Sequence, residues 1–479
     1  MKSLKYILSA FVLIFAIAFT SCELPDNLDP KEATEVPIGT IFTNSVVTFA
    51  NTVNSSSVNL NVSRLFAQYW QQTTYFDESR YNLQDRGIPD SYNSAFYKDV
   101  LMDLKEAKKL ISAEEVDGIL AIENANKMAI LEVMEVYSYQ CLVDAFGNVP
   151  YSEALMGAEN STPKYDDAAT IYADLLNKIS TAINTMNTDH GSFGSADVLF
   201  DGDVASWKTF AASVKLRLGI RLADVDPAAA KSAVESAVSA GVFAEGEGAI
   251  FYYNGVVPHV NTIYSHFSVD GRKDWLPANT IVDKMKELND PRIGQYFTMY
   301  EGDYKGAIYG LNGAQSYNNY SNFTERFMAA DFEADLMSFP EVAFILAEAA
   351  QRGWNVGGSA EEWYNKAISE SIMYWGGTQE EVDAYLAQAS VAYDAANWKM
   401  SIGTQKWIAL YNQAVEAWAE WRRLDYPVLN IPEGMTYGDI PVRMNYPFDE
   451  GELNGPNYEA AVAAMGGDTQ NIKLFWDVN

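Results

Sequence analysis

Residues 338–353 read SFPEVAFILAEAAQRG, and this segment is the clearest indication of the fold. Ser338 and Glu341 stand three positions apart around a proline, which is the arrangement of a helix-capping box with proline in the first turn. The apolar run that follows is made of good helix formers and stops at Gly353, a residue type that commonly ends helices. We therefore predict a helix that opens with a capping box at Ser338.

Similar signals of helix starts and stops recur along the chain. Further capping boxes begin at Ser359 and Thr378, and Asp226 with Pro227 opens a helix that ends at Gly241. Apolar residues recur at helical spacing over 207–222. Other helices are expected over residues 92–111, 121–145, 168–186 and 405–423. Many of these helices follow one another in pairs and strand-like alternation is rare. The sequence therefore predicts a mainly α protein of stacked antiparallel helix pairs, without a strict 34-residue repeat.

The composition argues against several classes of function. The 479 residues carry 64 Asp and Glu against 33 Lys and Arg, and a net charge of -31 repels nucleic-acid backbones. We expect no nucleic-acid partner. Only Cys22 and Cys141 are present, and the three histidines form no HExxH pair, so neither a disulfide framework nor a zinc enzyme is expected. We expect no cofactor and no metal, and we expect Cys141 to be a small buried side chain.

The N-terminus has the pattern of an export signal. Lys2 and Lys5 precede an apolar run over residues 7–19, and small residues lead into Cys22. Cysteine at this position resembles the acylated residue of a bacterial lipoprotein, so residues 1–21 are predicted to be cleaved and Cys22 to carry the lipid anchor. The alternative is an ordinary secreted protein with an incidental cysteine. Residues 22–39 are polar and proline-punctuated, which is typical of a flexible tether.

Residues 251–323 differ from the rest of the chain. They contain 14 aromatic residues in 73, against 63 in all 479, and they are rich in Gly, Asn and Tyr with little apolar periodicity. A stretch this long without helices is usually functional or disordered. Exposed Tyr and Trp rings can stack on flat ligand faces and still offer a polar edge, whereas most such rings simply pack under loops.

Six stretches of the sequence, in order, resemble the SusD/RagB family of surface lipoproteins, closest to its starch-binding, outer-membrane-associated branch. They are LVDAFGNVPYSEAL (142–155), WKTFAASVKLRLGIRLADVDP (207–227), LNDPRIGQYF (288–297), SFPEVAFILAEAAQRGW (338–354), QKWIALYNQAVEAWAEWRRLDYPVL (405–429) and IPVRMNYPFDEGELN (440–454).

The resemblance implies a SusD-like single domain over residues 40–479. Its scaffold would be tetratricopeptide-like helix pairs, with a loop-rich insertion at about 244–335. The resemblance also implies a lipid-anchored protein of the cell outer membrane that faces the exterior. It would capture a nutrient oligosaccharide, or in some members a peptide, without catalysis. The implied partner is a SusC-like TonB-dependent transporter, which the lipoprotein covers as a lid.

Two segments are the candidates for the ligand surface, because glycan-binding members of the family use aromatic platforms flanked by Asn, Gln and Arg. Sugar C–H faces stack on rings, while hydroxyls bond to amides and guanidinium groups. The candidates in residues 69–86 are Trp70, Tyr75, Arg80, Tyr81 and Asn82. The candidates in the aromatic insertion are Trp275, Tyr296, Tyr300, Tyr309, Tyr317 and Tyr320.

Other conspicuous residues are interpreted as fold-specifying. Arg292 is expected to pair with a local carboxylate in the turn after Asp290, and EAWAEWRR (416–423) to combine packing with intrahelical charge pairs. Asp201 and Asp203 are interpreted as a turn and a helix cap, and not as a calcium site.

Two alternative functions remain from the sequence. A surface glycoside hydrolase would need a pair of carboxylates about 5 to 9.5 Å apart in a cleft. No hydrolase-like motif surrounds any acid of this chain. A helical scaffold that binds only other proteins would not require a long aromatic insertion.

Overall fold

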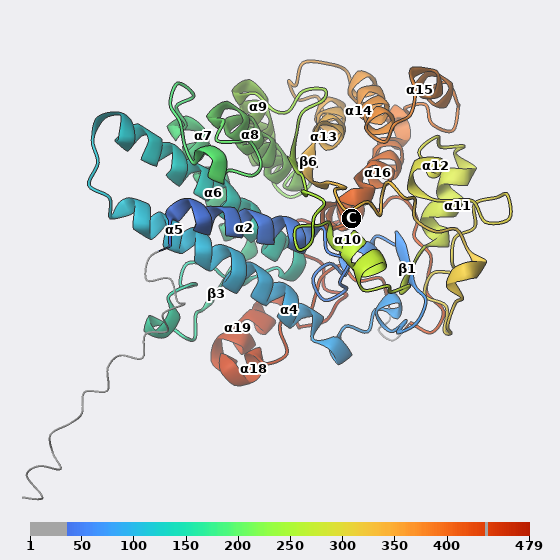
Figure 1. The fold of residues 1–479 in the computed structure, drawn as a ribbon, viewed down its shortest axis with the longest axis horizontal. Coiled ribbons are helices and arrows are strands. Elements are labelled where there is room, and N and C mark those ends of the chain that lie inside the picture. Colours follow the sequence, from blue (N-terminus) through green and yellow to red (C-terminus); the bar gives the residue numbers. More distant parts are fainter. Residues whose placement is uncertain (1–35, 436–438) are drawn as a thin grey trace, which may run out of the picture. The chain divides into compact units, whose positions relative to one another are not determined.

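The computed structural model describes residues 36–435 and 439–479 (Figure 1). Contacts divide the chain into two units, Met1–Pro37 and Ile38–Asn479. Only Val36 and Pro37 of the first unit are described, so the predicted signal segment, Cys22 and most of the predicted tether lie outside the described residues. All the elements below belong to the second unit.

Helices dominate this unit. The α-helices are α2 (Ile38–Val53), α3 (Ser63–Phe66), α4 (Ile88–Ser94), α5 (Met102–Ser112), α6 (Gly118–Phe146), α7 (Ala168–Thr185), α8 (Val204–Arg221), α9 (Pro227–Ala240), α10 (Thr262–Tyr264), α11 (Asn279–Glu287), α12 (Ile293–Tyr296), α13 (Phe339–Gln351), α14 (Ala360–Tyr374), α15 (Gln379–Leu386), α16 (Trp398–Ala409), α17 (Ala414–Leu424), α18 (Glu450–Leu453) and α19 (Gly455–Met465). The π-helical segments are η3 (Ala95–Leu101) and η6 (Ser265–Val269). The 3-10 turns are η1 (Glu78–Arg80), η2 (Gln84–Arg86), η4 (Gly157–Glu159), η5 (Gly194–Ala196), η7 (Tyr317–Asn319), η8 (Ala395–Asn397) and η9 (Leu410–Asn412).

Consecutive helices pack as pairs, which confirms the predicted mainly α fold. The pairs are α6 with α7, α8 with α9, α13 with α14, and α16 with α17. They are linked in turn, because α7 packs on α8, α8 on α13, and α13 on α16. In Figure 1 this array runs across the upper part of the view, from α6 and α7 to α14 and α16. No helix among the described residues has both the length and the apolar character needed to cross a bilayer.

Six strands form three two-stranded antiparallel sheets. β1 (Trp70–Gln72) pairs with β5 (Trp275–Pro277), β2 (Val149–Pro150) with β3 (Tyr165–Asp166), and β4 (Gly248–Phe251) with β6 (Ala334–Ser338). The first pairing sets Trp70 opposite Pro277 and Gln72 opposite Trp275. The third pairing closes the base of the insertion by bringing its two ends together.

Most of the predicted helix caps are present. Ser359 and Thr378 form complete capping boxes at α14 and α15, and Asp226 caps α9 through the Ala229 amide. Asp203 accepts from the amides of Ala205 and Ser206 and so caps α8, as predicted.

The predicted capping box at Ser338 is wrong, although α13 begins where expected. The Ser338 hydroxyl donates to Asp335 at 2.7 Å, and the Glu341 carboxylate is bound to Arg217 on α8. A contact within β6 therefore occupies the Ser338 side chain, and a tertiary contact to α8 occupies that of Glu341.

The predicted helix over residues 405–423 is in fact two helices. η9 and Gln413 separate α16 from α17. The Gln413 side chain donates to Asp335 at 2.9 Å, and Asn412 donates to the Glu333 carbonyl at 3.1 Å. The break is thus fixed by hydrogen bonds to the segment around β6.

Two further differences concern the edges of the helical scaffold. α2 was not predicted, and it begins two residues inside the segment assigned to the tether. Residues 251–323 show little apolar periodicity, yet α11 lies within them and buries Ile281, Val282 and Met285 against the core.

Ion pairs between helices run through the core. Arg217 on α8 makes a two-pronged pair with Glu341 on α13 at 2.6 and 2.7 Å. Arg423 on α17 makes another with Glu348 on α13 at 2.6 and 2.5 Å. All four side chains are at most 1% exposed. Paired, fully hydrogen-bonded charges are the only form in which charges are usually buried, so these pairs fix how the helices dock.

The motif over residues 416–423 is therefore fold-specifying, as predicted, but most of its charge pairs are not intrahelical. Glu416 and Glu420 both accept from Arg221 on α8, and only the Arg423–Glu420 pair lies within α17. Arg292 pairs with Asp290 at 2.5 Å, which confirms the predicted local pair.

Candidate functional site

The two segments predicted to form the ligand surface lie against each other. The β1–β5 pairing joins them, and the Thr73 carbonyl accepts from the Gln315 amide at 2.9 Å. Arg80 donates to the Asn312 side chain at 3.0 Å. Residues more than 200 positions apart in sequence are thus held at one place on the surface.

Five of the eleven candidate residues are buried: Trp70, Tyr81, Trp275, Tyr296 and Tyr309, each at most 5% exposed. A buried ring has no free face on which a sugar can stack. These five rings fill the core, so the structure leaves them no face for stacking.

The contacts of the buried rings show what they do instead. The Trp70 ring lies 5.5 Å from that of Trp275 and 5.1 Å from that of Phe323, measured between centroids. Tyr296 stacks on Tyr411 at 4.4 Å. Such packing supports the loops from below and holds the exposed residues in place.

Tyr81 and Tyr309 have the same supporting role. Their ring centroids lie 6.2 Å apart. The Tyr81 hydroxyl accepts from Gln68 at 2.9 Å, and the Tyr309 hydroxyl donates to the Leu65 carbonyl at 2.6 Å. Their polar edges are therefore already used within the protein.

The other six candidates reach solvent. Tyr75 is 61% exposed, and its φ of 55° lies in the left-handed region. Such a conformation costs a non-glycine residue about 1–3 kcal/mol and is often found at functional sites. Arg80 and Asn82 are half-buried; Arg80 is bound to Asp77, and Asn82 donates to Asp85 at 2.9 Å.

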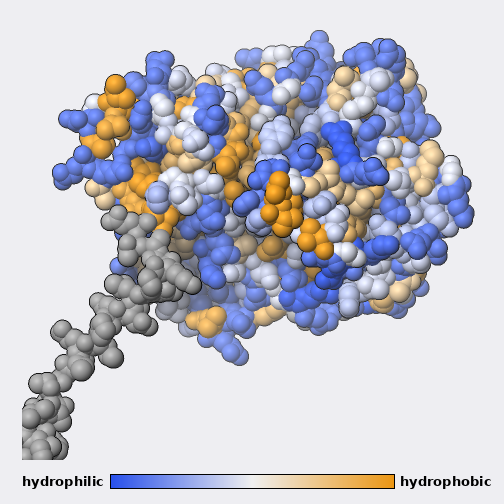
Figure 2. All heavy atoms as spheres, viewed as in Figure 1, coloured by the Kyte–Doolittle hydropathy of each residue, from blue (hydrophilic) through white to orange (hydrophobic). Residues whose placement is uncertain are grey.

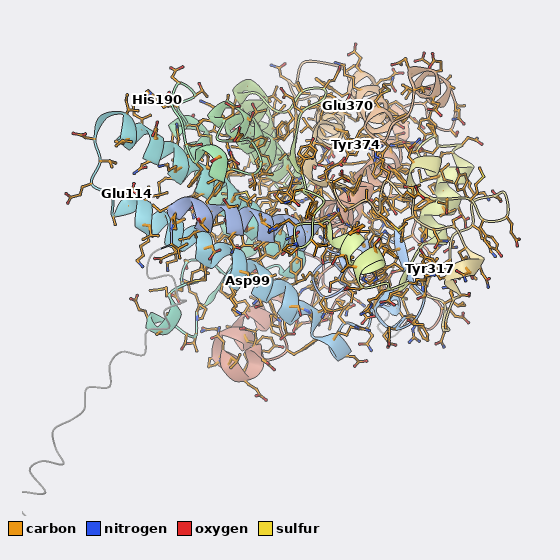
Figure 3. The ribbon with its side chains drawn as sticks, in the orientation of Figure 1. Asp99, Glu114, His190, Tyr317, Glu370 and Tyr374 are labelled. Atoms are coloured by element: carbon orange, nitrogen blue, oxygen red, sulfur yellow. The ribbon has the colours of Figure 1, made fainter. Side chains whose placement is uncertain are left out.

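Tyr300, Tyr317 and Tyr320 are half-exposed and are each placed beside a lysine. Lys305 lies 5.0 Å from the Tyr300 ring and 4.9 Å from the Tyr320 ring, and Lys273 lies 5.2 Å from the Tyr317 ring. Figure 3 shows Tyr317 on the opposite side of the view from Glu114 and His190. The insertion therefore carries Tyr317 at the end of the molecule away from the α5–α6 turn.

A cavity of about 530 Å³, which we call the polar hollow, lies where the two segments meet. This volume falls within the usual range of small-molecule sites. Three stretches line it: residues 51–59 at the end of α2, residues 72–86, and residues 258–275. Lining residues include Asn51, Ser57, Gln72, Thr74, Tyr75, Arg86, His266, Asp270, Arg272, Asp274 and Trp275.

Of the candidates, the polar hollow contains only Tyr75 and Trp275; the sequence-based prediction missed its charged residues. Arg272 donates to Asp274 at 2.6 Å, and Arg86 forms an ion pair with the buried Glu78. Burial raises the pKa of Glu78. The sequence signal for Arg272 and Asp274 is the polar run GRKD (271–274) immediately before Trp275.

Three buried polar atoms in the wall of the hollow make no hydrogen bond among the described residues. They are Nε1 of Trp275, Nε2 of His266 and Oδ1 of Asn59. Burial lowers the pKa of His266, outweighing the nearby Asp274, so its imidazole is neutral at neutral pH. Buried polar atoms are nearly always hydrogen-bonded, so a ligand hydroxyl or a water is expected to bond to them.

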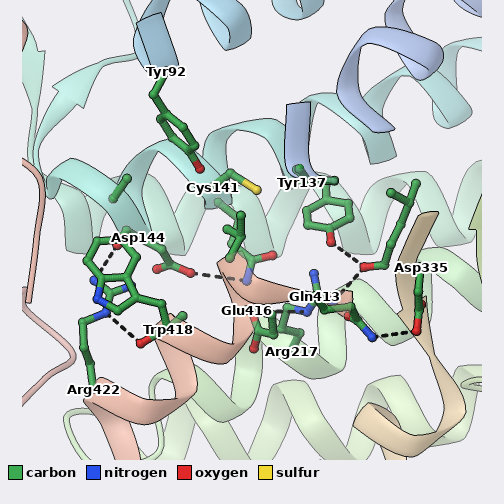
Figure 4. A pocket seen from close by; sticks show the side chains of 16 residues that line it. Tyr92, Tyr137, Cys141, Asp144, Arg217, Asp335, Gln413, Glu416, Trp418 and Arg422 are labelled. Atoms are coloured by element: carbon green, nitrogen blue, oxygen red, sulfur yellow. Dashed lines mark hydrogen bonds and ion pairs between the residues drawn. The ribbon is translucent and has the colours of Figure 1, made fainter. Parts of the chain in front are cut away.

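A second cavity, shown in Figure 4, is internal and holds about 20 Å³. Arg217, Glu416, Asp144 and Arg422 line it, and Cys141 lies at its edge with a thiol pKa raised by burial. The space suits about one water molecule. This cavity belongs to the ionic core and offers no room for a ligand, and Cys141 is the buried side chain that was predicted.

Within residues 36–435 and 439–479, no group of three or more His, Cys, Asp or Glu side chains is arranged to hold a metal ion. Of the two Asp side chains that line the polar hollow, Asp274 is instead paired with Arg272.

Comparison with known proteins identifies one family. A family model described as SusD-like, "starch-binding associating with outer membrane", matches residues 30–447. No curated protein sequence matches significantly.

Solved structures extend the likeness to the whole fold. A chitin-binding protein is 27% identical with a TM-score of 0.79, over 92% of this chain and 100% of its own. A SusD homologue from Bacteroides uniformis is 26% identical with a TM-score of 0.78, over 92% and 99%. A chitin-binding SusD homologue from Flavobacterium johnsoniae, 24% identical with a TM-score of 0.79 over 92% and 99%, shares the fold.

Proposed function

The chain belongs to the SusD-like family, and from that premise we propose that it is a non-catalytic surface lipoprotein that captures an oligosaccharide in the polar hollow. The observation that carries this proposal is the combination of the exposed Tyr75 ring with unpartnered polar atoms at one cavity. A ring face suits sugar C–H groups, and a hydroxyl can accept from Trp275 Nε1 while donating to the neutral His266 Nε2.

The charge of the hollow favours a neutral sugar. Arg86 and Arg272 are already paired with Glu78 and Asp274, and Asp270 adds a further negative charge. An anionic sugar would have to break one of these pairs or lie beside an unpaired carboxylate. Two similar solved structures are described as chitin-binding, so oligomers of N-acetylglucosamine are the first ligands to test, followed by starch oligosaccharides.

Anchoring and delivery are also part of the proposal. We infer that Cys22 carries the lipid that holds the protein on the outer face of the outer membrane. The captured sugar would pass to a SusC-like TonB-dependent transporter, over which this protein would act as a lid. The family description, which names association with the outer membrane, supports the outer-membrane location.

Calorimetric titration with a panel of soluble chitin and starch oligosaccharides tests the binding site. Tyr75→Ala should weaken binding at least about fivefold, the effect expected of a central contact residue. Phe448→Ala is the matched control, because this aromatic residue is 40% exposed and does not line the hollow. If Tyr75→Ala binds every sugar as well as the native chain does, the site is misplaced. Binding of peptides in place of sugars would favour the peptide-binding alternative.

The same panel tests whether the protein is an enzyme. Asp270 and Asp274 are the carboxylates that line the hollow. We expect no release of reducing ends. Release that disappears in Asp270→Asn or Asp274→Asn would show that the protein is a hydrolase.

A further inference from the structure

A second surface cavity, the aromatic hollow, lies along the outer side of α2. It holds about 630 Å³, within the range of ligand sites. One wall is the face of α2 that carries Thr40, Thr43, Asn44, Val47 and Asn51, residues spaced three or four apart and therefore aligned along the helix. The other wall comes from residues 251–260, which lead toward α10.

The aromatic hollow combines an exposed ring with amide groups. Tyr252 is 69% exposed, so its ring is available to a ligand. Asn51 is held by its oxygen, which accepts from the Tyr253 hydroxyl at 3.0 Å, and its amide nitrogen makes no hydrogen bond among the described residues. A positioned amide donor beside an open ring is the same pairing of groups that suits a sugar in the polar hollow.

The two hollows are adjacent. Asn51, Pro258 and Val260 line both, so these residues form the partition between them. Figure 2 shows an apolar patch near the centre of the view, over the segment that leads into α10, where Val256 and Val257 are 69% and 62% exposed. A chain lying in the polar hollow could continue past this segment into the aromatic hollow.

We propose that the aromatic hollow is a second subsite for the same oligosaccharide, with Tyr252 as its stacking platform and Asn51 as a donor shared by both subsites. This inference rests on the proposed function and extends it. The ligand is then an extended chain of neutral sugars, and short oligosaccharides occupy the polar hollow alone.

Two other occupants fit less well. The segment before α2 contains ELPDNLDPKEATE over residues 23–35, which is acidic and offers few apolar groups to an aromatic wall. A protein partner would pack on the exposed valines, but that packing would give the Asn51 amide no hydrogen-bond acceptor. The polar groups of the hollow are thus best matched by a hydroxyl-rich chain.

A length series tests the proposal. Calorimetry would compare chitin oligosaccharides, and in parallel starch oligosaccharides, of two to about eight sugars with the native chain, Tyr252→Ala, Tyr252→Phe, Tyr75→Ala and Phe448→Ala. We expect Tyr252→Ala to weaken long oligosaccharides about fivefold to tenfold and to leave the shortest unchanged. Tyr252→Phe should retain native affinity, because it keeps the ring, and Tyr75→Ala should weaken all lengths.

Each other outcome overturns the proposal in a distinguishable way. If Tyr252→Ala binds long chains normally while Tyr75→Ala does not, the second subsite is wrong and the proposed function stands. If no oligosaccharide of either type binds the native chain, both are wrong. If Tyr252→Ala leaves long-chain affinity unchanged but abolishes co-purification with a membrane transporter, the hollow is a protein-docking surface. Stronger binding of long chains after deletion of residues 23–35 would show that this segment occupies the hollow.

Discussion

Replacing Glu420 with glutamine tests whether the buried ion pairs hold the helix pairs together. Glu420 on α17 accepts from Lys406 on α16 at 2.8 Å, from Arg423 on its own helix at 2.7 Å, and from Arg221 on α8. These four side chains are at most 3% exposed. Burial acts to raise the pKa of Glu420, but Arg423, Lys406 and Arg221 outweigh it and hold the pKa well below 4.5.

The size of the expected loss of stability depends on which cation loses its ion-pair partner. Arg221 keeps Glu416, and Arg423 keeps Glu348, whereas Lys406 forms no other ion pair among the described residues. Glu420→Gln therefore leaves one buried ammonium group uncompensated, which costs about 3–5 kcal/mol. This is a large share of a total free energy of unfolding of about 5–15 kcal/mol.

Urea unfolding at neutral pH, followed by circular dichroism, measures the loss. The double variant Glu420→Gln with Lys406→Met should recover most of the stability, because it removes the buried charge that the single variant leaves without a partner. Glu106→Gln is the control: Glu106 pairs with Lys109 on the surface, at 45% and 70% exposure, and an exposed pair contributes at most about 1 kcal/mol. A loss below about 1 kcal/mol for Glu420→Gln, or no recovery in the double variant, would refute the reasoning.

Two further predictions concern pH and anchoring. Burial raises the pKa of Asp335 from 3.8 to about 7. Between these pH values the folded state holds a proton that the unfolded state has released. The free energy of unfolding therefore falls as pH rises from about 4 to about 7, and then levels off. Asp335→Asn should reduce this fall in the free energy of unfolding by an amount on the order of 4 kcal/mol. Urea unfolding at about pH 4 and about pH 8 measures the difference in stability between the two pH values. The same difference in Asp335→Asn as in the native chain would contradict the assignment to Asp335. Cys22→Ala should move the protein from the membrane to the soluble fraction on cell fractionation; continued membrane retention would count against the lipid anchor.

The helical scaffold could be predicted because its signals are local. The caps at Ser359, Thr378, Asp226 and Asp203 depend on residues within one turn, and the structure contains each of them. Ser338 failed because its hydroxyl bonds to Asp335 in β6. Asp335 lies only three residues earlier, but Glu341, the other half of the motif, is bound to Arg217 on α8, and no local motif encodes that tertiary contact.

The candidate ligand site was harder to predict, because aromatic residues serve both the core and binding surfaces. Trp70 and Tyr75 are five positions apart in one segment, yet one is 1% and the other 61% exposed. The difference comes from the β1–β5 pairing, which turns Trp70 toward Trp275 and Phe323. The polar hollow also needs residues 51–59, whose proximity to residues 258–275 is a long-range contact.

The division between scaffold and site has a consequence for how the protein can diversify. None of the buried ion-paired residues Arg217, Arg221, Glu341, Glu420 and Arg423 lines either hollow. Substitutions in the hollows therefore leave the helix-docking contacts intact, and the effects of distant, independent sites on the free energy of unfolding usually add. The ligand specificity of the surface can therefore change from one sugar to another while the helical scaffold stays the same.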